Sequence, residues 1–488
     1  MTGLSNATLH TLPPEVLTPA YNRKEVSAGI AHIGVGNFHR AHQALYIDRL
    51  LGAAGQSSWG ILGAGIRHGH REEARADAFR RQDGLFSLTE FAPDESRTIR
   101  VVGSIVDYVS CVDGYEAIID RLAAPEIRIV SLTITEGGYF VDSEGRFQVN
   151  DPFIAEDLKR DIPQSAFGLV TETLRRRREA GAGPFTVLSC DNLQHNGRVA
   201  ETAFCGFAEA RDASLAAWIR ENVSFPSCMV DRIVPSVSDD DIRRLDKASG
   251  IDDLMPVYSE DFIQWVVEDK FCAGRPEFET AGVQLTGNVE PYEQVKLRML
   301  NAGHSVLAFS GLMMGYRKVD EAMNDNDIVS LLENFLNEDV APLLSPPEDV
   351  NLSSYAAQVL HRFRNHAVGD QLERIASDSF SKLPVFLGET VTKLLKTGRD
   401  IHRVAFALAC WAECETGKDG KGAVIKLSEP AARDEERSVF HDSNLLAVLN
   451  LPIFSGWGIE TNKGFRDAFE RYRSDLRTKG PAEVIATL

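Results

Sequence analysis

The sequence is poor in cysteine, in positive charge and in long apolar runs, and each shortage excludes a class of protein. Seven cysteines, an odd number spread thinly over 488 residues, do not form a disulfide framework and suit a reducing compartment. The 52 lysines and arginines stand against 71 aspartates and glutamates, and this net charge of −19 disfavours binding to nucleic acid. The most apolar stretches have about half of the roughly 20 residues that cross a bilayer. We expect a cytoplasmic protein without nucleic-acid or membrane partners, since no signal-peptide pattern opens the chain either.

The composition that is present is typical of a folded protein, with 43% hydrophobic and 25% charged residues. Up to residue 289, short apolar runs alternate with amphipathic segments, as in a parallel sheet that helices cover on both faces. From residue 290 a periodicity of 3.6 residues dominates. The sequence therefore predicts an α/β fold with two domains. Residues 1–289 form a Rossmann-type dinucleotide-binding domain, and residues 290–488 form a mostly α-helical domain for substrate binding and catalysis.

The predicted strands of the sheet are six apolar runs, Gly29–Val35, Trp59–Ile66, Ile99–Ile105, Ile127–Ile134, Phe185–Ser189 and Met229–Val234. Helices are predicted between them at Ala41–Leu51 and Val112–Leu122. In the second domain the main predicted helices are Tyr292–Met314, Ile328–Asn337, Leu352–Phe363, Phe386–Lys396, Arg403–Glu413 and Pro481–Ala486.

A turn with two glycines joins the first predicted strand to the first helix. Gly34 and Gly36 let the backbone bend tightly, so that a pyrophosphate can reach free N–H groups at the start of a helix. His39 stands where the usual motif has its third glycine, and a plain strand–helix turn is the alternative interpretation. His39 and Arg40 either touch the pyrophosphate or pack the helix. The predicted cofactor-binding residues of this turn are Gly34, Gly36, Asn37, Phe38, His39 and Arg40.

The segment after the second strand bears on which dinucleotide binds. NAD-selective folds often place an acidic residue there, about 20 residues past the last glycine, where it binds the ribose. In this chain Arg67, His68, Gly69, His70 and Arg71 precede the first acid, Glu72. A basic turn that contains Arg67 can accommodate a 2′-phosphate. We expect NAD as the cofactor and leave NADP open.

The densest group of polar residues on an apolar helix is Glu293, Lys296, Asn301 and His304. At about 100° per residue, Glu293, His304 and Asn301 lie roughly 60°, 80° and 140° from Lys296, on one broad face. A desolvated lysine has a lowered pKa and suits a general base, and an asparagine amide can donate to an alkoxide or ketone oxygen. The alternative is a surface salt bridge between Glu293 and Lys296. Tyr292 and Lys296 also match the Tyr-x-x-x-Lys spacing of short-chain dehydrogenases, although Pro291 and the chain length argue against that class.

Polar residues also follow two of the predicted strands. Asn192 comes after Phe185–Ser189, and Asp231 lies within the last strand, so both are expected near the carboxyl edge of the sheet, where ligands of such sheets bind. Cys410 and Cys414 are spaced for one helix face, but with no histidine or second cysteine pair nearby they predict packing. No metal site is expected.

Taken together, these segments resemble the polyol-specific long-chain dehydrogenases. The Phe-His-Arg-Ala-His turn and the Lys-x4-Asn-x2-His element are the most specific matches. The resemblance runs through Gly29–Gln43, Ser131–Tyr139, Ser189–Leu193, Met229–Ile233, Lys296–His304, Asp370–Ile375 and Ser377–Lys382.

The resemblance implies a metal-independent, nicotinamide-dependent interconversion of a secondary alcohol and a ketone, typically D-mannitol and D-fructose, in a cleft between a Rossmann-type and a helical domain. Lys296 would be the general acid/base, Asn192 and Asn301 would hold the reacting oxygen, and Glu293 would connect Lys296 to water. The polyol hydroxyls would be bound by Asp231, His304, Arg374 and Lys382.

Other activities in the same family remain alternatives. A hexuronate (fructuronate or tagaturonate) reductase would need a cation for the carboxylate, which Arg374 or Lys382 can supply, and an arabinitol or sorbitol dehydrogenase fits the same motifs. A protein that binds nucleotide without catalysis would lack Lys296 or Asn301, and both are present. Members of this type are often monomers, so the resemblance is compatible with a monomer whose partner is a small-molecule polyol or ketose.

Overall fold

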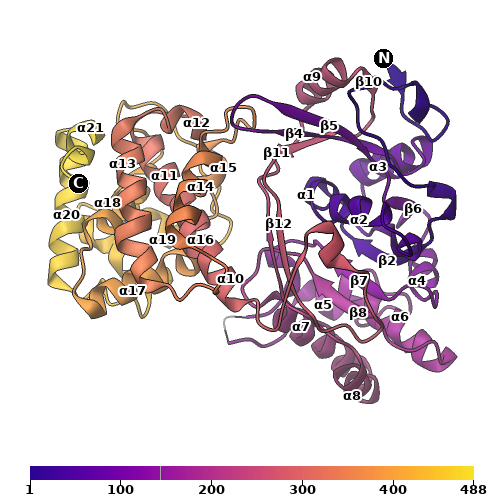
Figure 1. The fold of residues 1–488 in the computed structure, drawn as a ribbon. Coiled ribbons are helices and arrows are strands. Elements are labelled where there is room, and N and C mark those ends of the chain that lie inside the picture. Colours follow the sequence, from indigo (N-terminus) through magenta and orange to yellow (C-terminus); the bar gives the residue numbers. More distant parts are fainter. Residues whose placement is uncertain (143) are drawn as a thin grey trace. The chain divides into compact units, whose positions relative to one another are not determined.

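The computed structural model describes residues 1–142 and 144–488 (Figure 1). Backbone contacts divide the chain into two compact units: Met1–Ala92 with Ser96–Glu290, and Pro291–Leu488 with Pro93–Glu95. The first unit contains a parallel sheet, and helices dominate the second. The predicted fold class is therefore confirmed. None of the helices in the described part of the chain has the length and apolar character needed to span a membrane.

A five-stranded parallel sheet forms the centre of the first unit, in the order β6-β3-β2-β7-β8. In chain order this is 3-2-1-4-5, a Rossmann-type arrangement in which the winding reverses between β2 and β7. Ligands of such sheets bind beyond the carboxyl ends of the strands at this reversal. The strands are β2 (Ala28–Ile33), β3 (Gly60–Gly65), β6 (Ile105–Ser110), β7 (Ile129–Leu132) and β8 (Thr186–Ser189).

The side chains of β2 alternate between two cores because successive residues of a strand point to opposite faces. Ala31 and Ile33 enter one core and Ile30 enters the other, so both faces of the sheet are covered. The helices of this unit are α1 (Asn37–Ala41), α2 (Gln43–Leu51), α3 (His70–Arg81), α4 (Tyr115–Leu122), α5 (Pro152–Asp157), α6 (Ala166–Ala180), α7 (Asn196–Arg211), α8 (Ala213–Asn222) and α9 (Asp239–Ser249).

Three small sheets complete the unit, and they correct two of the predicted strands. The run Ile99–Ile105 is divided between β5, which pairs with β4, and β6 of the main sheet. The run Met229–Val234 overlaps β9, which lies antiparallel to β12 outside the main sheet. An apolar run shows burial but not which sheet a strand joins. The small sheets contain β1 (Thr2–Gly3) and β10 (Ile251–Asp252); β11 (Val257–Glu260), β4 (Phe86–Phe91) and β5 (Arg97–Val102); and β13 (Gln284–Thr286), β12 (Gln264–Glu268) and β9 (Cys228–Asp231).

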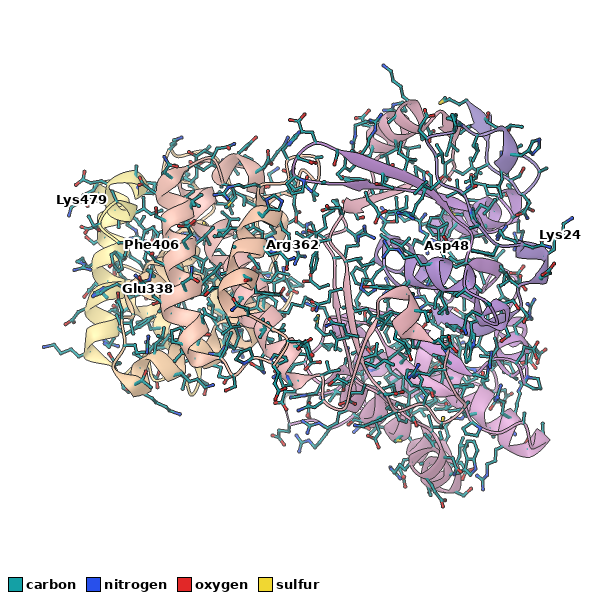
Figure 2. The ribbon with its side chains drawn as sticks, in the orientation of Figure 1. Lys24, Asp48, Glu338, Arg362, Phe406 and Lys479 are labelled. Atoms are coloured by element: carbon teal, nitrogen blue, oxygen red, sulfur yellow. The ribbon has the colours of Figure 1, made fainter. Side chains whose placement is uncertain are left out.

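The second unit is built around α18, whose residues Arg403–Cys414 are all buried. A helix that is buried on every side lies in the middle of a bundle. Figure 2 labels Phe406 inside this unit and Lys479 at its surface. The helices are α10 (Glu290–Val295), α11 (Ala302–Met313), α12 (Val319–Ala322), α13 (Asn326–Asn334), α14 (Leu352–Phe363), α15 (Leu372–Ala376), α16 (Ser379–Phe386), α17 (Gly388–Thr397), α18 (His402–Cys414), α19 (Asp434–Ser438), α20 (Lys463–Thr478) and α21 (Pro481–Ile485), with π-helical turns η6 (Lys296–Asn301) and η7 (Phe335–Val340).

Candidate active site

The turn after β2 has the geometry that a dinucleotide needs. Gly34 adopts a φ of +97°, and a Cβ placed on it would lie 2.1 Å from the carbonyl oxygen of Thr133, so only glycine fits. At Gly36 a Cβ would meet only the carbonyl oxygen of Gly34, at 3.8 Å, so the backbone there is open to an approaching group. The helix α1 starts directly after Gly36, with its first N–H groups at a helix N-terminus. The residues of this turn therefore fit a pyrophosphate.

A chain of buried hydrogen bonds holds the carbonyl group of Gly34 in place. Thr133 donates its hydroxyl proton to the carbonyl oxygen of Gly34 at 2.7 Å, and His32 Nε2 lies 2.9 Å from the same hydroxyl oxygen. His32 Nδ1 lies 2.8 Å from Ser131 Oγ, which is 2.9 Å from the amide of Gln43. Burial lowers the pKa of His32 to about 3, so its ring is neutral.

His39 stands at the position of the missing third glycine and packs its ring against a side chain of β2. Its ring stacks on that of His32, with centroids 3.5 Å apart and an angle of 14° between the planes. Phe38 stacks on His42 at 5.0 Å. The Arg40 guanidinium donates to Asn37 Oδ1 at 2.8 Å and also to the carbonyl oxygen of Met255. The side chains of this turn thus pack against the protein, which leaves the backbone N–H groups as the candidates for binding a pyrophosphate.

The turn after β3 is basic, and the first acidic residue that follows it, Glu72, forms hydrogen bonds inside the protein. Arg67 to Arg71 are exposed, whereas Glu72 is buried and accepts hydrogen bonds from Tyr108 and, at 3.0 Å, from Arg75. Arg67 donates to the carbonyl oxygen of Ile134 at 3.3 Å, which places it beside the loop after β7. The Glu72 carboxylate is therefore already bound, and the exposed groups of the turn are cationic or neutral.

Asn192 and Asp231 lie at strand ends in the first unit. Asn192 is exposed directly beyond β8, and Asp231 is the buried last residue of β9. The neighbouring Asp191, to which the sequence assigned no role, accepts hydrogen bonds from the backbone of Ile134 and Thr135 at 3.0 and 2.8 Å. Asp191 thus joins the loop after β8 to the loop after β7, and it sets the position from which Asn192 projects.

One continuous helix of the second unit carries four of the predicted residues. Glu293 lies on α10, Lys296 and Asn301 are the first and last residues of the π-helical turn η6, and His304 lies on α11. Glu293 and Lys296 are buried. The ring of His304 stacks on Phe363 of α14, with centroids 4.1 Å apart. The helix thus holds a carboxylate, an amine, an amide and an imidazole within four turns, largely out of water.

Arg374 and Lys382 lie on two helices next to this one, since α15 contacts α11 and α16 contacts η6. Arg374 forms a bidentate salt bridge with Asp370, in which Nε donates to Oδ1 at 2.8 Å and Nη2 donates to Oδ2 at 2.5 Å. Lys382 donates to the carbonyl oxygens of Ile375 and Ser377 at 3.2 and 2.6 Å. The second unit therefore carries six of the predicted residues on one continuous helix and two helices that contact it: Glu293, Lys296, Asn301, His304, Arg374 and Lys382.

The short-chain dehydrogenase alternative fails on the environment of its tyrosine. Tyr292 donates to Asp349 at 2.8 Å, and burial together with this hydrogen bond raises the pKa of Tyr292 to about 12. A catalytic tyrosine of that class needs a lowered pKa. Among the described residues, no group of three or more histidine, cysteine, aspartate or glutamate side chains is arranged to hold a metal ion.

A Rossmann unit with a dinucleotide turn, followed by a helical unit with a buried lysine, defines a class of oxidoreductases. Family models match both parts: the mannitol dehydrogenase Rossmann domain over residues 28–280 and the mannitol dehydrogenase C-terminal domain over residues 288–475. The chain belongs to the mannitol dehydrogenase family.

Relatives match over the full length. A polyol:NADP oxidoreductase of Gluconobacter oxydans is 46% identical over 484 residues, which cover 99% of each chain. A crystal structure of D-sorbitol dehydrogenase has a TM-score of 0.92 and 44% identity, and covers 99% of this chain and 100% of its own. Mannitol 2-dehydrogenase of Pseudomonas fluorescens, in a ternary complex with NAD and D-mannitol, has a TM-score of 0.91 and 42% identity, and covers 100% and 99%. The family that the sequence motifs indicated is confirmed.

Proposed function

We propose that the protein interconverts a polyol and its ketose, with D-mannitol and D-fructose as the pair, by hydride transfer to or from a nicotinamide cofactor and without a metal ion. The observation that carries the proposal is the buried Lys296 on one helical turn with Asn301, in a chain of the mannitol dehydrogenase family. Relatives named for polyol, sorbitol and mannitol oxidation support the substrate class.

In this proposal Lys296 is the residue that donates and accepts the proton. When bound, the nicotinamide supplies a hydride to the ketone carbon or accepts it from the alcohol carbon. The Lys296 ammonium gives its proton to the ketone oxygen during reduction, and the neutral amine takes the hydroxyl proton during oxidation. The amides of Asn301 and Asn192 donate hydrogen bonds to that oxygen and stabilise its alkoxide character. Glu293, one helical turn before Lys296, exchanges the proton with water.

The remaining candidates are assigned to binding. Asp231, His304, Arg374 and Lys382 are proposed to hold the other hydroxyl groups of the polyol. The N–H groups of Asn37, Phe38 and His39 are proposed to bind the pyrophosphate, in the turn that Gly34 and Gly36 shape.

The pairing of Arg374 supports a neutral substrate over a hexuronate at that side chain, and Lys382, the other candidate cation, donates to two backbone carbonyl oxygens. A carboxylate substrate requires an available cation, and the guanidinium of Arg374 is held in a two-pronged pair by Asp370, which is itself buried. Replacing that partner by a substrate carboxylate would leave the buried Asp370 carboxylate unpaired, which is unfavourable. Polyol hydroxyls, in contrast, can accept from the outer N–H groups of an arginine that stays paired.

We expect kcat/KM for D-fructose to exceed kcat/KM for D-fructuronate by about 100-fold or more, because Arg374 is neutralised by Asp370. Initial rates with both ketones at one cofactor concentration measure the ratio. The Asp370→Asn variant, which releases the charge of Arg374, should lower the ratio by raising the rate with fructuronate. A wild-type enzyme that prefers fructuronate would replace the polyol assignment by a hexuronate reductase.

We further propose NADP(H) as a cofactor that the protein uses at least as well as NAD(H). The exposed turn from Arg67 to Arg71 offers two guanidinium groups for a 2′-phosphate, and the first carboxylate, Glu72, is buried against Tyr108 and Arg75. The relative from Gluconobacter oxydans, named for NADP, supports this choice.

The double variant Arg67→Ala/Arg71→Ala should raise KM for NADPH about 10-fold or more and change KM for NADH less than twofold, because only NADPH carries the 2′-phosphate. Initial rates with each cofactor give both constants. Arg81→Ala, at the far end of the same helix α3, is the control for the general loss of positive charge. Equal effects on the two cofactors would contradict a 2′-phosphate site at this turn.

A further inference from the structure

The geometry points to the π-helical turn η6 as the device that brings Lys296 and Asn301 onto one face of their helix, with Arg298 as the positioning residue that anchors the turn from behind. The inference rests on the proposed function, because it assigns a purpose to the position of the proposed acid/base and of its amide partner.

The turn η6 interrupts an otherwise regular helix. Residues 290–295 and 302–313 are α-helical, whereas between them the N–H of Ala302 donates to the carbonyl oxygen of Leu297, five residues back. This is the hydrogen bond of a π-helix, which places roughly 4.4 residues in a turn, or about 80° per residue. Such turns are rare and concentrate at functional sites.

The wider turn changes which side chains share a face. In a regular α-helix, Asn301 lies about 140° around the axis from Lys296, and the four polar residues of this helix span about 140°. With five steps of about 82°, which is 360° divided by 4.4, through η6, Asn301 lies only about 50° from Lys296. His304 then falls within about 10° of Lys296 on the other side, while Glu293 stays near 60°. The π turn thus halves the arc over which these four groups are spread.

Arg298 lies on the opposite side of the turn, about 160° from Lys296. Its buried side chain reaches α17, where Nε donates to Thr390 Oγ1 at 3.1 Å and Nη1 lies 3.3 Å from the carboxylate of Glu389. Thr390 is fully buried, and Glu389 is half exposed and also pairs with Lys393 at 2.6 Å. The back of the π turn is therefore fastened to a neighbouring helix through one guanidinium group.

A second π turn packs against the first. The turn η7 contacts η6, α14 and α17, and its Asp339 accepts two hydrogen bonds from Arg403 of α18, at 2.8 and 2.7 Å. A π turn carries one residue more than the α-helix has room for, and this extra residue can move along the helix unless its surroundings hold it. The contacts of Arg298 and of η7 keep the extra residue between Lys296 and Asn301.

Loss of the anchor should therefore misplace the amide of Asn301 relative to the amine of Lys296, and leave ligand binding nearly intact. A displacement of about 1 Å at a reacting centre costs up to about 100-fold in rate. Thr390→Val removes the hydrogen bond to Arg298 and keeps the volume of the side chain. We expect it to lower kcat about 10-fold, and to change KM for the ketose and the Kd of the cofactor less than twofold.

Thr392→Val is the matched control, because Thr392 lies on the same helix and its hydroxyl donates only to the carbonyl oxygen of Gly388. It should leave kcat within twofold. The pH profile of kcat should shift in Thr390→Val and not in Thr392→Val, since a displaced amide changes the surroundings of the titrating lysine. Hydrogen exchange in the peptide over residues 296–302 should be faster in Thr390→Val alone, a readout that needs no activity.

Equal kcat values and equal exchange rates in the two threonine variants would overturn the inference. If Thr390→Val does not fold, the half-exposed Glu389→Gln serves in its place, with an expected loss in kcat of about threefold. The two proposals also fail separately. If Lys296→Ala is active, the proposed function is wrong. If Lys296→Ala is inactive and Thr390→Val behaves like the wild type, only the proposed role of the π turn is wrong.

Discussion

Replacing Lys296 with alanine is expected to lower kcat for ketose reduction and for polyol oxidation about 1000-fold or more. The variant loses the group that gives and takes the proton, an effect worth about 100-fold to 10,000-fold in other enzymes, and it also loses the positive charge next to the developing alkoxide. The Kd of the cofactor should stay within about threefold, because the proposed contacts to its pyrophosphate are made by the turn after β2 and not by Lys296. Single-turnover rates and fluorescence titration with the reduced cofactor measure the two effects.

The control for this experiment is Lys396→Ala, a substitution of an exposed lysine at the end of α17. It should leave all constants unchanged. Added primary amines should restore part of the activity of Lys296→Ala, because the missing group is a proton carrier. Turnover close to that of the wild type would show that another group moves the proton, and the proposed mechanism would be wrong.

Replacing Gly34 with alanine should weaken the binding of the cofactor about 100-fold or more. The new Cβ would lie 2.1 Å from the carbonyl oxygen of Thr133, well below a contact distance, and the residue would keep a φ of +97° that alanine disfavours. The turn must then open, which displaces the N–H groups proposed for the pyrophosphate. Isothermal titration with the reduced cofactor measures the loss.

Gly55→Ala separates the two causes in that experiment. Gly55 has a similar φ of +80°, but a Cβ there would meet nothing within 4 Å. Gly55→Ala introduces the backbone strain but no steric clash. It should lower the free energy of unfolding slightly and leave the Kd of the cofactor unchanged. If Gly34→Ala also bound the cofactor normally, the turn after β2 would not be the binding site.

The fold was largely predictable because its signals are local. Apolar runs between amphipathic segments indicated the parallel sheet, and the 3.6-residue period located seven of the twelve α-helices described in the second unit within a few residues. It did not single out α12, α15, α16, α19 or the long helix α20, although α20 is amphipathic. Other failures came where local information ends. The run Ile99–Ile105 is apolar throughout, yet the chain leaves one sheet and enters another within it. The sequence also did not indicate the strands β4, β11, β12 and β13, which are short and depend on partners far along the chain.

The candidate site shows the same limit. Lys296, Asn301 and His304 stand out as polar residues on an apolar helix, and Gly34 and Gly36 stand out as a turn. The residues that hold these groups in place do not stand out in the sequence. Each acts through a partner about 60 to 100 residues away: Asp191 with Ile134, Thr133 with Gly34, and Arg298 with Thr390. The π turn cannot be predicted when every residue of a helix is assumed to advance 100° around the axis. The spread of the four polar groups over 140° was the only hint, since a working site would gather them more closely.

A measurement of hydride transfer itself tests the proposed activity of the protein. The purified protein is mixed with D-fructose and NADPH, the absorbance at 340 nm is followed, and the sugar product is identified by chromatography. We expect oxidation of NADPH with D-mannitol formed in equal amount, and the reverse reaction from D-mannitol and NADP. The absence of cofactor oxidation with D-fructose, with either NADPH or NADH, would contradict the assignment of this chain as a mannitol–fructose oxidoreductase.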